Sequence, residues 1–152
     1  MAHPIQGVLT VLGRLLLVGI FLASALGNKI QNFDAVAGAM AAKGIPQPKI
    51  MLVGAIVFLI AGGVSILVGY KARIGALLLL IFLVLATYYF HNFWALSPEA
   101  VVQFPGYERP HVEVEMINAM KNAALMGAML MIMANGSGPW SLDGGGRRAA
   151  AE

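Results

Sequence analysis

Four long apolar stretches separated by short connections constrain this chain more than any other feature of its sequence. They cover about residues 7–26, 49–69, 74–90 and 113–134. A bilayer core is about 30 Å thick, and a helix needs about 20 mainly apolar residues to cross it. Of the 152 residues, 59% are hydrophobic and only 11% are charged. The sequence therefore predicts an all-α polytopic membrane protein, a bundle of four transmembrane helices.

The short connections leave no room for a second domain. We expect residues 1–143 to form a single membrane domain and residues 144–152 to form a flexible tail. Between the second and third spans stand only the residues "YKAR", so these two helices must form a tight antiparallel hairpin. Ala61, Ser65 and Gly69 repeat a small residue every fourth position, which predicts a close helix contact on that face.

The connection between the first and second spans predicts a short helix at the membrane surface. Asp34 suits the N-cap and Gly44 suits the C-terminal stop of this helix. The residues between them are too few to cross a bilayer, and Phe33, Val36 and Met40 form an apolar face.

The connection between the third and fourth spans, residues 95–111, also contains helix signals. Ser97, Pro98 and Glu99 supply an N-cap, a first-turn proline and a first-turn acid. These residues predict a second short interfacial helix, which continues through Val102.

Four spans place both termini on one side of the membrane. Lys and Arg are enriched in cytoplasmic loops. Basic residues on the side of the termini (Lys71, Arg73, Arg147 and Arg148) therefore favour cytoplasmic N- and C-termini, although four on the other side (Lys29, Lys43, Lys49 and Arg109) nearly balance them.

Composition excludes several classes of function. The chain has no cysteine, so it forms no disulfide, thiolate nucleophile or cysteine-held iron–sulfur cluster. Its net charge of +3 comes from ten Lys and Arg residues spread along the chain without a basic run. We therefore expect no nucleic-acid partner.

Polar residues gather at the start of the fourth span. His111, Glu115, Asn118 and Asn122 follow at spacings of four, three and four, which places them on one helical face. Polar groups below the headgroups cost a few kcal/mol each unless they are paired, so they normally face a bundle interior or a cavity.

The exits of the first and third spans lie at the same membrane surface. The sequence therefore predicts a pocket between helix ends that binds a quinone or a lipid. Its predicted cofactor-binding residues are Arg14, Asn28, Lys29, His91, Glu115, Asn118 and Asn122.

One alternative to this pocket stays open. The amides and Glu115 can form hydrogen bonds between helices without any ligand. His91 and His111 lie at the same surface, but no Glu-x-x-His repeat accompanies them, so we predict no metal site.

Arg14 is the costly residue of the first span. The second and third spans contain no acid, so its partner must be a backbone carbonyl, a lipid or quinone-like headgroup, or another subunit. Val18, Phe21, Ala25 and Asn28 follow Arg14 on one stripe of the helix.

The order of several motifs resembles the DoxX family of small membrane proteins. After Arg14 come Gly27 and Lys29, then "KGIPQP", "GGVSILVGYKARIGALLLL", "FHNFW", "MKNAALMGAML" and "GSGPWSLD". The resemblance covers roughly residues 10–143. It implies a four-helix protein of the bacterial inner membrane that is related to membrane oxidoreductases, which include a small subunit of a thiosulfate:quinone oxidoreductase.

This resemblance implies an accessory subunit of a membrane redox or energy-converting complex, with lipids and other membrane subunits as partners. The sequence has no self-contained catalytic motif. Many family members carry a glutamate before the paired glycines of the second span, where this chain has Leu59, so no role of that acid transfers. A purely structural or assembly subunit, or a carrier of a small or lipidic solute, are the alternatives.

Overall fold

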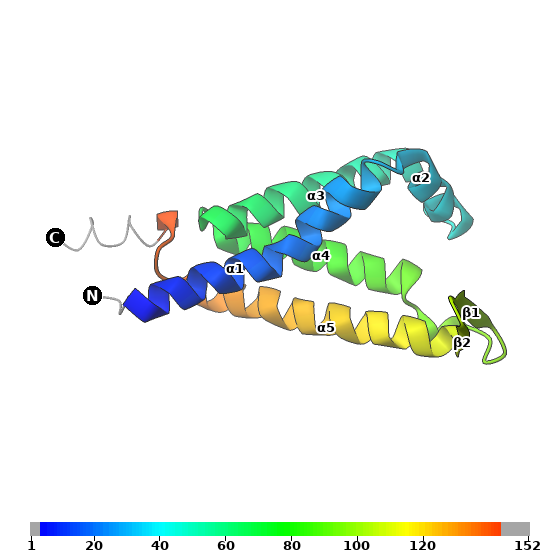
Figure 1. The fold of residues 1–152 in the computed structure, drawn as a ribbon. Coiled ribbons are helices and arrows are strands. Elements are labelled where there is room, and N and C mark those ends of the chain that lie inside the picture. The colour runs from blue at the N-terminus through cyan, green and yellow to red at the C-terminus, as the bar shows by residue number, and fades with distance from the viewer. Residues whose placement is uncertain (1–3, 144–152) are drawn as a thin grey trace.

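The computed structural model describes residues 4–143. Its body consists of four helices, each of which is long and apolar enough to cross a membrane. They are α1 (Pro4–Ser24), extended by a π-helical turn (Ala25–Lys29), α3 (Pro48–Val68), α4 (Ala72–Phe90) and α5 (His111–Asn135). Figure 1 shows these helices side by side, with both ends of the described chain at the same end of the bundle. The predicted all-α, four-span architecture is confirmed. The predicted tail, with Arg147 and Arg148, lies outside the described residues.

The predicted first interfacial helix is present as α2 (Phe33–Ala42), at the end of the bundle away from the termini (Figure 1). Its N-cap is Asn32 rather than Asp34, which lies in the first turn. Gly44 adopts a left-handed φ of 73° just after the helix, as its predicted role as a stop requires. Ala37 and Met40 are buried and belong to one core cluster with Leu52 of α3.

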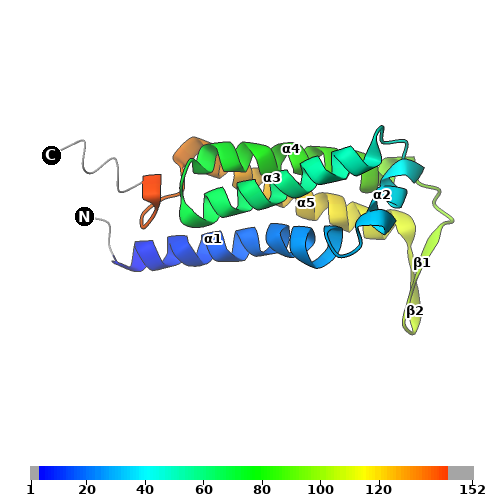
Figure 2. The ribbon, with the colours of Figure 1, turned by 90° about the horizontal axis from the view of Figure 1, so that it is seen from above.

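The prediction of a second interfacial helix is wrong. After a short 3-10 turn (Phe93–Ala95), the chain forms an antiparallel hairpin of β1 (Val101–Phe104) and β2 (Tyr107–Pro110), which projects to one side of the bundle in Figure 2. Pro105 and Gly106 form its two-residue turn, and Gly106 has a φ of 84°. The β-branched pair Val101–Val102 prefers an extended backbone, and this preference overrides the capping signals.

Helices α3 and α4 pack backbone against backbone. A Cβ atom added at Gly62 would lie 2.8 Å from the carbonyl oxygen of Gly75, and one at Gly75 would lie 2.6 Å from Oγ of Ser65. Of the predicted small-residue face, Ser65 contacts α4, whereas Gly69 lies against Arg14 and Ser137 and Ala61 is exposed. Gly62 supplies the closest approach instead.

Helix α1 packs with the stripe that its sequence predicts. Arg14, Val18, Phe21 and Ala25 are buried, but Asn28 is exposed. The core cluster of the bundle includes Val18, Leu59, Leu79, Leu83 and Met129.

The α3–α4 contact generates a test with a matched control. We expect Gly62→Ala to destabilise the protein by about 1–3 kcal/mol, because the added methyl group overpacks the interface. Gly54→Ala, on the same helix, adds a methyl group with no atom within 4 Å and should leave stability unchanged or slightly raised. Unfolding in mixed detergent micelles, followed by circular dichroism, measures both variants. Equal losses in both would contradict the assigned contact.

Candidate functional site

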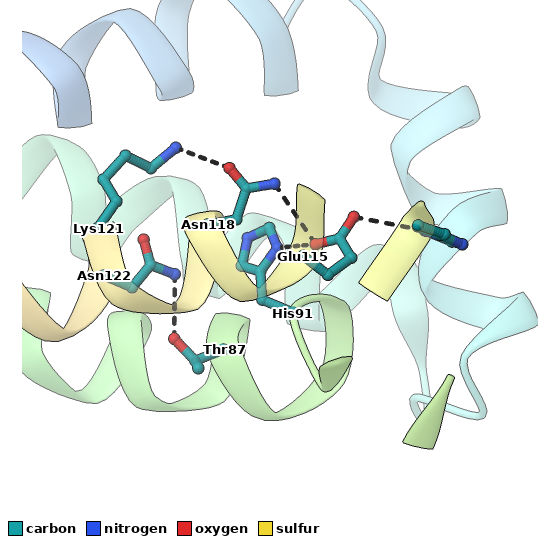
Figure 3. A network of polar contacts seen from close by, with 7 residues as sticks. Thr87, His91, Glu115, Asn118, Lys121 and Asn122 are labelled. Carbon is teal, nitrogen blue, oxygen red and sulfur yellow. Dashed lines mark hydrogen bonds and ion pairs between the residues drawn. The ribbon is translucent and has the colours of Figure 1, made fainter. Parts of the chain in front are cut away.

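A chain of polar contacts links the end of α4 to the start of α5 (Figure 3). His91 is the C-cap of α4, and the β-hairpin brings the chain back so that α5 begins at His111. Glu115 therefore lies one turn into α5 and opposite His91, with 2.5 Å between Nδ1 of His91 and Oε2 of Glu115. The side chains of His91 and Glu115 are only 24% and 17% exposed. This pair is the centre of the candidate site.

The same carboxylate collects further partners from α5. Nε2 of His111 lies 3.6 Å from Oε1 of Glu115, one helical turn away. Nδ2 of Asn118 donates to Oε2 over 3.4 Å, a long hydrogen bond. Oδ1 of Asn118 accepts from Nζ of Lys121 over 3.1 Å. We call His91, Glu115, Asn118 and Lys121 the Glu115 chain.

Asn122 forms a separate link between the same two helices. Its Nδ2 donates to Oγ1 of Thr87 over 3.0 Å, and Asn122 is only 6% exposed. Thr87 was not among the predicted site residues, although the sequence held a signal for it: Thr87 precedes His91 by one helical turn in an otherwise apolar segment. Figure 3 shows this link beside the Glu115 chain.

Two predicted site residues at the exit of the first span form no contact with the Glu115 chain. Nζ of Lys29 donates to Oγ of Ser24 over 2.6 Å and lies 5.4 Å from the ring centroid of Phe82. The side chain of Asn28 is exposed, and its backbone carbonyl accepts from Asn32. The π-helical turn changes the rotation of the last residues of α1, an effect that spacing arguments based on an α-helix do not include.

Arg14 lies at the opposite end of the bundle from the Glu115 chain, beside the turn between α3 and α4. Its Nη2 donates to the backbone oxygen of Trp140 over 2.6 Å. The partner is thus a backbone carbonyl, one of the alternatives that the sequence left open. A Cβ atom at Gly69 would lie 2.4 Å from Nη1 of Arg14.

The segment after α5 closes this end of the bundle, a role that the sequence analysis missed. The carboxylate of Asp143 accepts from the backbone N–H groups of Lys71 (3.0 Å) and Ala72 (3.2 Å) and so caps the start of α4. The backbone N–H of Asp143 donates to the oxygen of Gly69 over 2.8 Å. The motif "GSGPWSLD" is therefore a structural strap over the α3–α4 turn.

Two open hollows lie at this same end. One, of about 500 Å³, is lined by Ile5, Gln6, Leu9 and Thr10. The other, of about 300 Å³, lies between α1 and α5 and is lined by Thr10, Gly13, Arg14, Leu17, Ala128, Ile132, Gly136, Ser137 and Gly138. Neither is lined by the Glu115 chain, so ligand binding between helix ends stays a prediction.

Comparison with known proteins shows to which family the chain belongs. The model of the DoxX family matches residues 9–92, more than half of the chain. The chain belongs to the DoxX family. The matched segment of this DoxX protein contains Arg14, Lys29 and His91 but ends before Glu115.

A curated relative extends the similarity over nearly the whole chain. This DoxX protein is 28% identical over 136 residues to the inner membrane protein YphA of Escherichia coli K12, and the alignment covers 90% of this chain and 89% of YphA. No solved structure matches this DoxX protein. Together with its four long apolar helices, these findings identify an integral membrane protein.

The Thr87–Asn122 link can be measured by a double-mutant cycle. We expect a coupling free energy of about 0.6 kcal/mol, and at most about 1.7 kcal/mol, between Thr87→Val and Asn122→Leu, because a lipid environment leaves the unfolded helices some alternative partners. Unfolding in mixed micelles provides the four stabilities. Asn135→Leu is the control, since its Nδ2 donates to Met131 within α5 and joins no two helices. A cycle with zero coupling would show that the hydrogen bond does not hold α4 to α5.

Proposed function

We propose that this DoxX protein is a non-catalytic accessory subunit of a membrane redox or energy-converting complex, and that its Glu115 chain binds the polar head of a quinone or lipid. The observation that carries this proposal is the His91–Glu115 pair, 2.5 Å apart and largely buried where two transmembrane helices meet. Ionisable groups within membrane-spanning helices commonly mark ligand or proton sites.

The Glu115 chain offers the chemistry that a quinone head requires. Asn118 and Lys121 carry N–H donors that suit a carbonyl oxygen. His91 and Glu115 are in hydrogen-bond contact, and imidazole and carboxyl groups are common proton carriers, so the pair would deliver or accept a proton at a quinone oxygen. Electrons would come from another subunit, consistent with an accessory role.

A structural or assembly function is the second candidate, and a specific observation favours it. Both side-chain links, His91–Glu115 and Thr87–Asn122, join α4 to α5 and already satisfy the groups they contain. Hydrogen bonds of this kind stabilise a membrane bundle without any ligand. Under this reading the protein docks beside larger subunits and holds no cofactor.

Retention of a co-purifying molecule separates the two functions. We expect the protein, isolated in mild detergent, to carry extractable quinone or lipid together with redox subunits. Asn118→Leu and Glu115→Gln should lower the retained quinone or lipid several-fold, because they remove a donor and the proton acceptor. Mass spectrometry of organic extracts, normalised to protein, measures this retention.

Asn135→Leu is the matched control, an exposed amide at the other end of α5. Retention that is unchanged in Asn118→Leu and Glu115→Gln would reject the site. Stoichiometric subunits without a bound quinone or specific lipid would support the assembly function instead.

We also propose that the protein resides in the inner membrane with its termini in the cytoplasm. The similarity to YphA, an inner membrane protein, supports the location, and Lys71 and Arg73 at the α3–α4 turn support the orientation.

The absence of native cysteine makes the orientation simple to test. Tyr70→Cys and Glu99→Cys place single thiols at exposed positions at opposite ends of the bundle. In intact cells with a permeabilised outer membrane, a membrane-impermeant maleimide should label Glu99→Cys and label Tyr70→Cys only after lysis. The reverse pattern would invert the assigned orientation.

A further inference from the structure

Arg14 is a buried cation without a counter-ion among the described residues. It is 6% exposed, and the ion pairs of the described residues do not include it. Nη2 has the carbonyl of Trp140, but Nε and Nη1 are buried without a hydrogen-bond partner. A guanidinium has five N–H donors, and leaving buried donors unpaired is costly. Its surroundings are therefore chemically incomplete.

The carboxylate of the strap does not neutralise this charge. The two oxygens of Asp143 accept from the backbone N–H groups of Lys71 and Ala72. The other side-chain charges at this end are cationic among the described residues, since Lys71 and Arg73 flank the same turn. The field around Arg14 thus favours an anion.

Arg14 lies at the level of the α3–α4 turn, where we expect lipid headgroups. Arg14 stands near the middle of α1, and its guanidinium lies against Gly69, the C-cap of α3. Arg14 is therefore beside the turn of the α3–α4 hairpin. The ends of membrane-spanning helices meet the interfacial region of a bilayer. A phosphate group of a lipid is the anion that this region supplies.

The hollow of about 300 Å³ beside Arg14 has an amphiphilic wall. Arg14 and Ser137 line its polar part, and Ser137 is 7% exposed with an Oγ that has no hydrogen-bond partner among residues 4–143. Leu17, Ala128 and Ile132 supply its apolar part, from α1 and α5. A molecule with an oxyanion head and a hydrocarbon chain complements both parts.

We propose that Arg14 and Ser137 bind the phosphate of an anionic phospholipid, whose acyl chain enters the hollow between α1 and α5. Guanidinium and phosphate form paired, charge-assisted hydrogen bonds that a neutral carbonyl cannot match. This site lies at the opposite end of the bundle from the Glu115 chain and does not rest on the function proposed for that chain.

Binding requires a shift of the strap, because Nε and Nη1 are covered in the present structure. The strap residues around Trp140 form no regular helix or strand, and the segment bends at Gly136 and Gly138, whose φ angles are 79° and 75°. Exchange of the Trp140 carbonyl for a phosphate oxygen replaces a neutral acceptor with a charged one. The lipid thereby supplies the missing counter-ion.

Thermal unfolding of the full-length protein in neutral detergent tests the proposal. Phosphatidylglycerol should raise the melting temperature by several degrees more than phosphatidylcholine with the same acyl chains. Arg14→Gln should abolish this difference or weaken the apparent affinity at least about tenfold, as expected for the loss of charged hydrogen bonds. Arg73→Gln, an exposed arginine on the same turn, should retain it.

A second pair of variants keeps the test decisive if Arg14→Gln does not fold. Gly13→Phe adds a ring to the wall of the hollow at a position with no atom within 4 Å of the added Cβ. It should fold and lose the phosphatidylglycerol effect. Gly19→Phe, equally free of neighbours on α1 and outside the hollow, should keep it.

Three results would overturn the proposal. The first is an equal response to both lipids, and the second is an undiminished lipid effect in Arg14→Gln or Gly13→Phe. The third is a stabilisation by inorganic phosphate alone that matches that of phosphatidylglycerol, which would assign the site to a free anion.

Discussion

Every polar group that this chain carries into the bilayer must find a partner inside the protein or at a membrane surface, because hydrocarbon offers none. The helices satisfy their own backbones, so the constraint falls on the side chains. Lys29 turns back to Ser24, and Asn122 reaches across to Thr87. The hydroxyl of Ser65 donates to the backbone carbonyl of Tyr70, which lies just after the end of α3 and outside any helix. Of these contacts, the one between Asn122 and Thr87 joins two helices, α5 and α4.

The same constraint divides the molecule into two chemically different ends. At one end, the carboxylate of Glu115 has hydrogen-bond partners in His91 and Asn118. At the other end, Arg14 has a single carbonyl for its several donors. The first end has a paired carboxylate and suits a proton or a carbonyl oxygen, whereas the second end has a buried cation without an anion among the described residues. The two ends therefore differ in the groups that they can bind.

Close helix packing sets the geometry on which both ends depend. Gly62 and Gly75 allow α3 and α4 to touch through their backbones, and Gly63 admits Val18 of α1. Because α4 is held in this way, its last turn presents His91 to α5. The strap then joins α5 to the α3–α4 turn through Asp143 and to α1 through Trp140. A short terminal segment thus contacts three of the four spanning helices.

The sequence alone determined the four spans, the helix before Gly44 and the stripe from Arg14 to Ala25, because hydrophobic length and helical periodicity act locally. It also placed Glu115, Asn118 and Asn122 on one face. Tertiary structure decided the rest. The partners of these side chains come from other helices or from the strap, and the rotation of Lys29 depends on a π-helical turn. A β-hairpin formed after α4, where capping signals predicted a helix. Two β-branched valines favour an extended backbone and the Pro-Gly pair favours a turn, and together these preferences outweigh the capping signals.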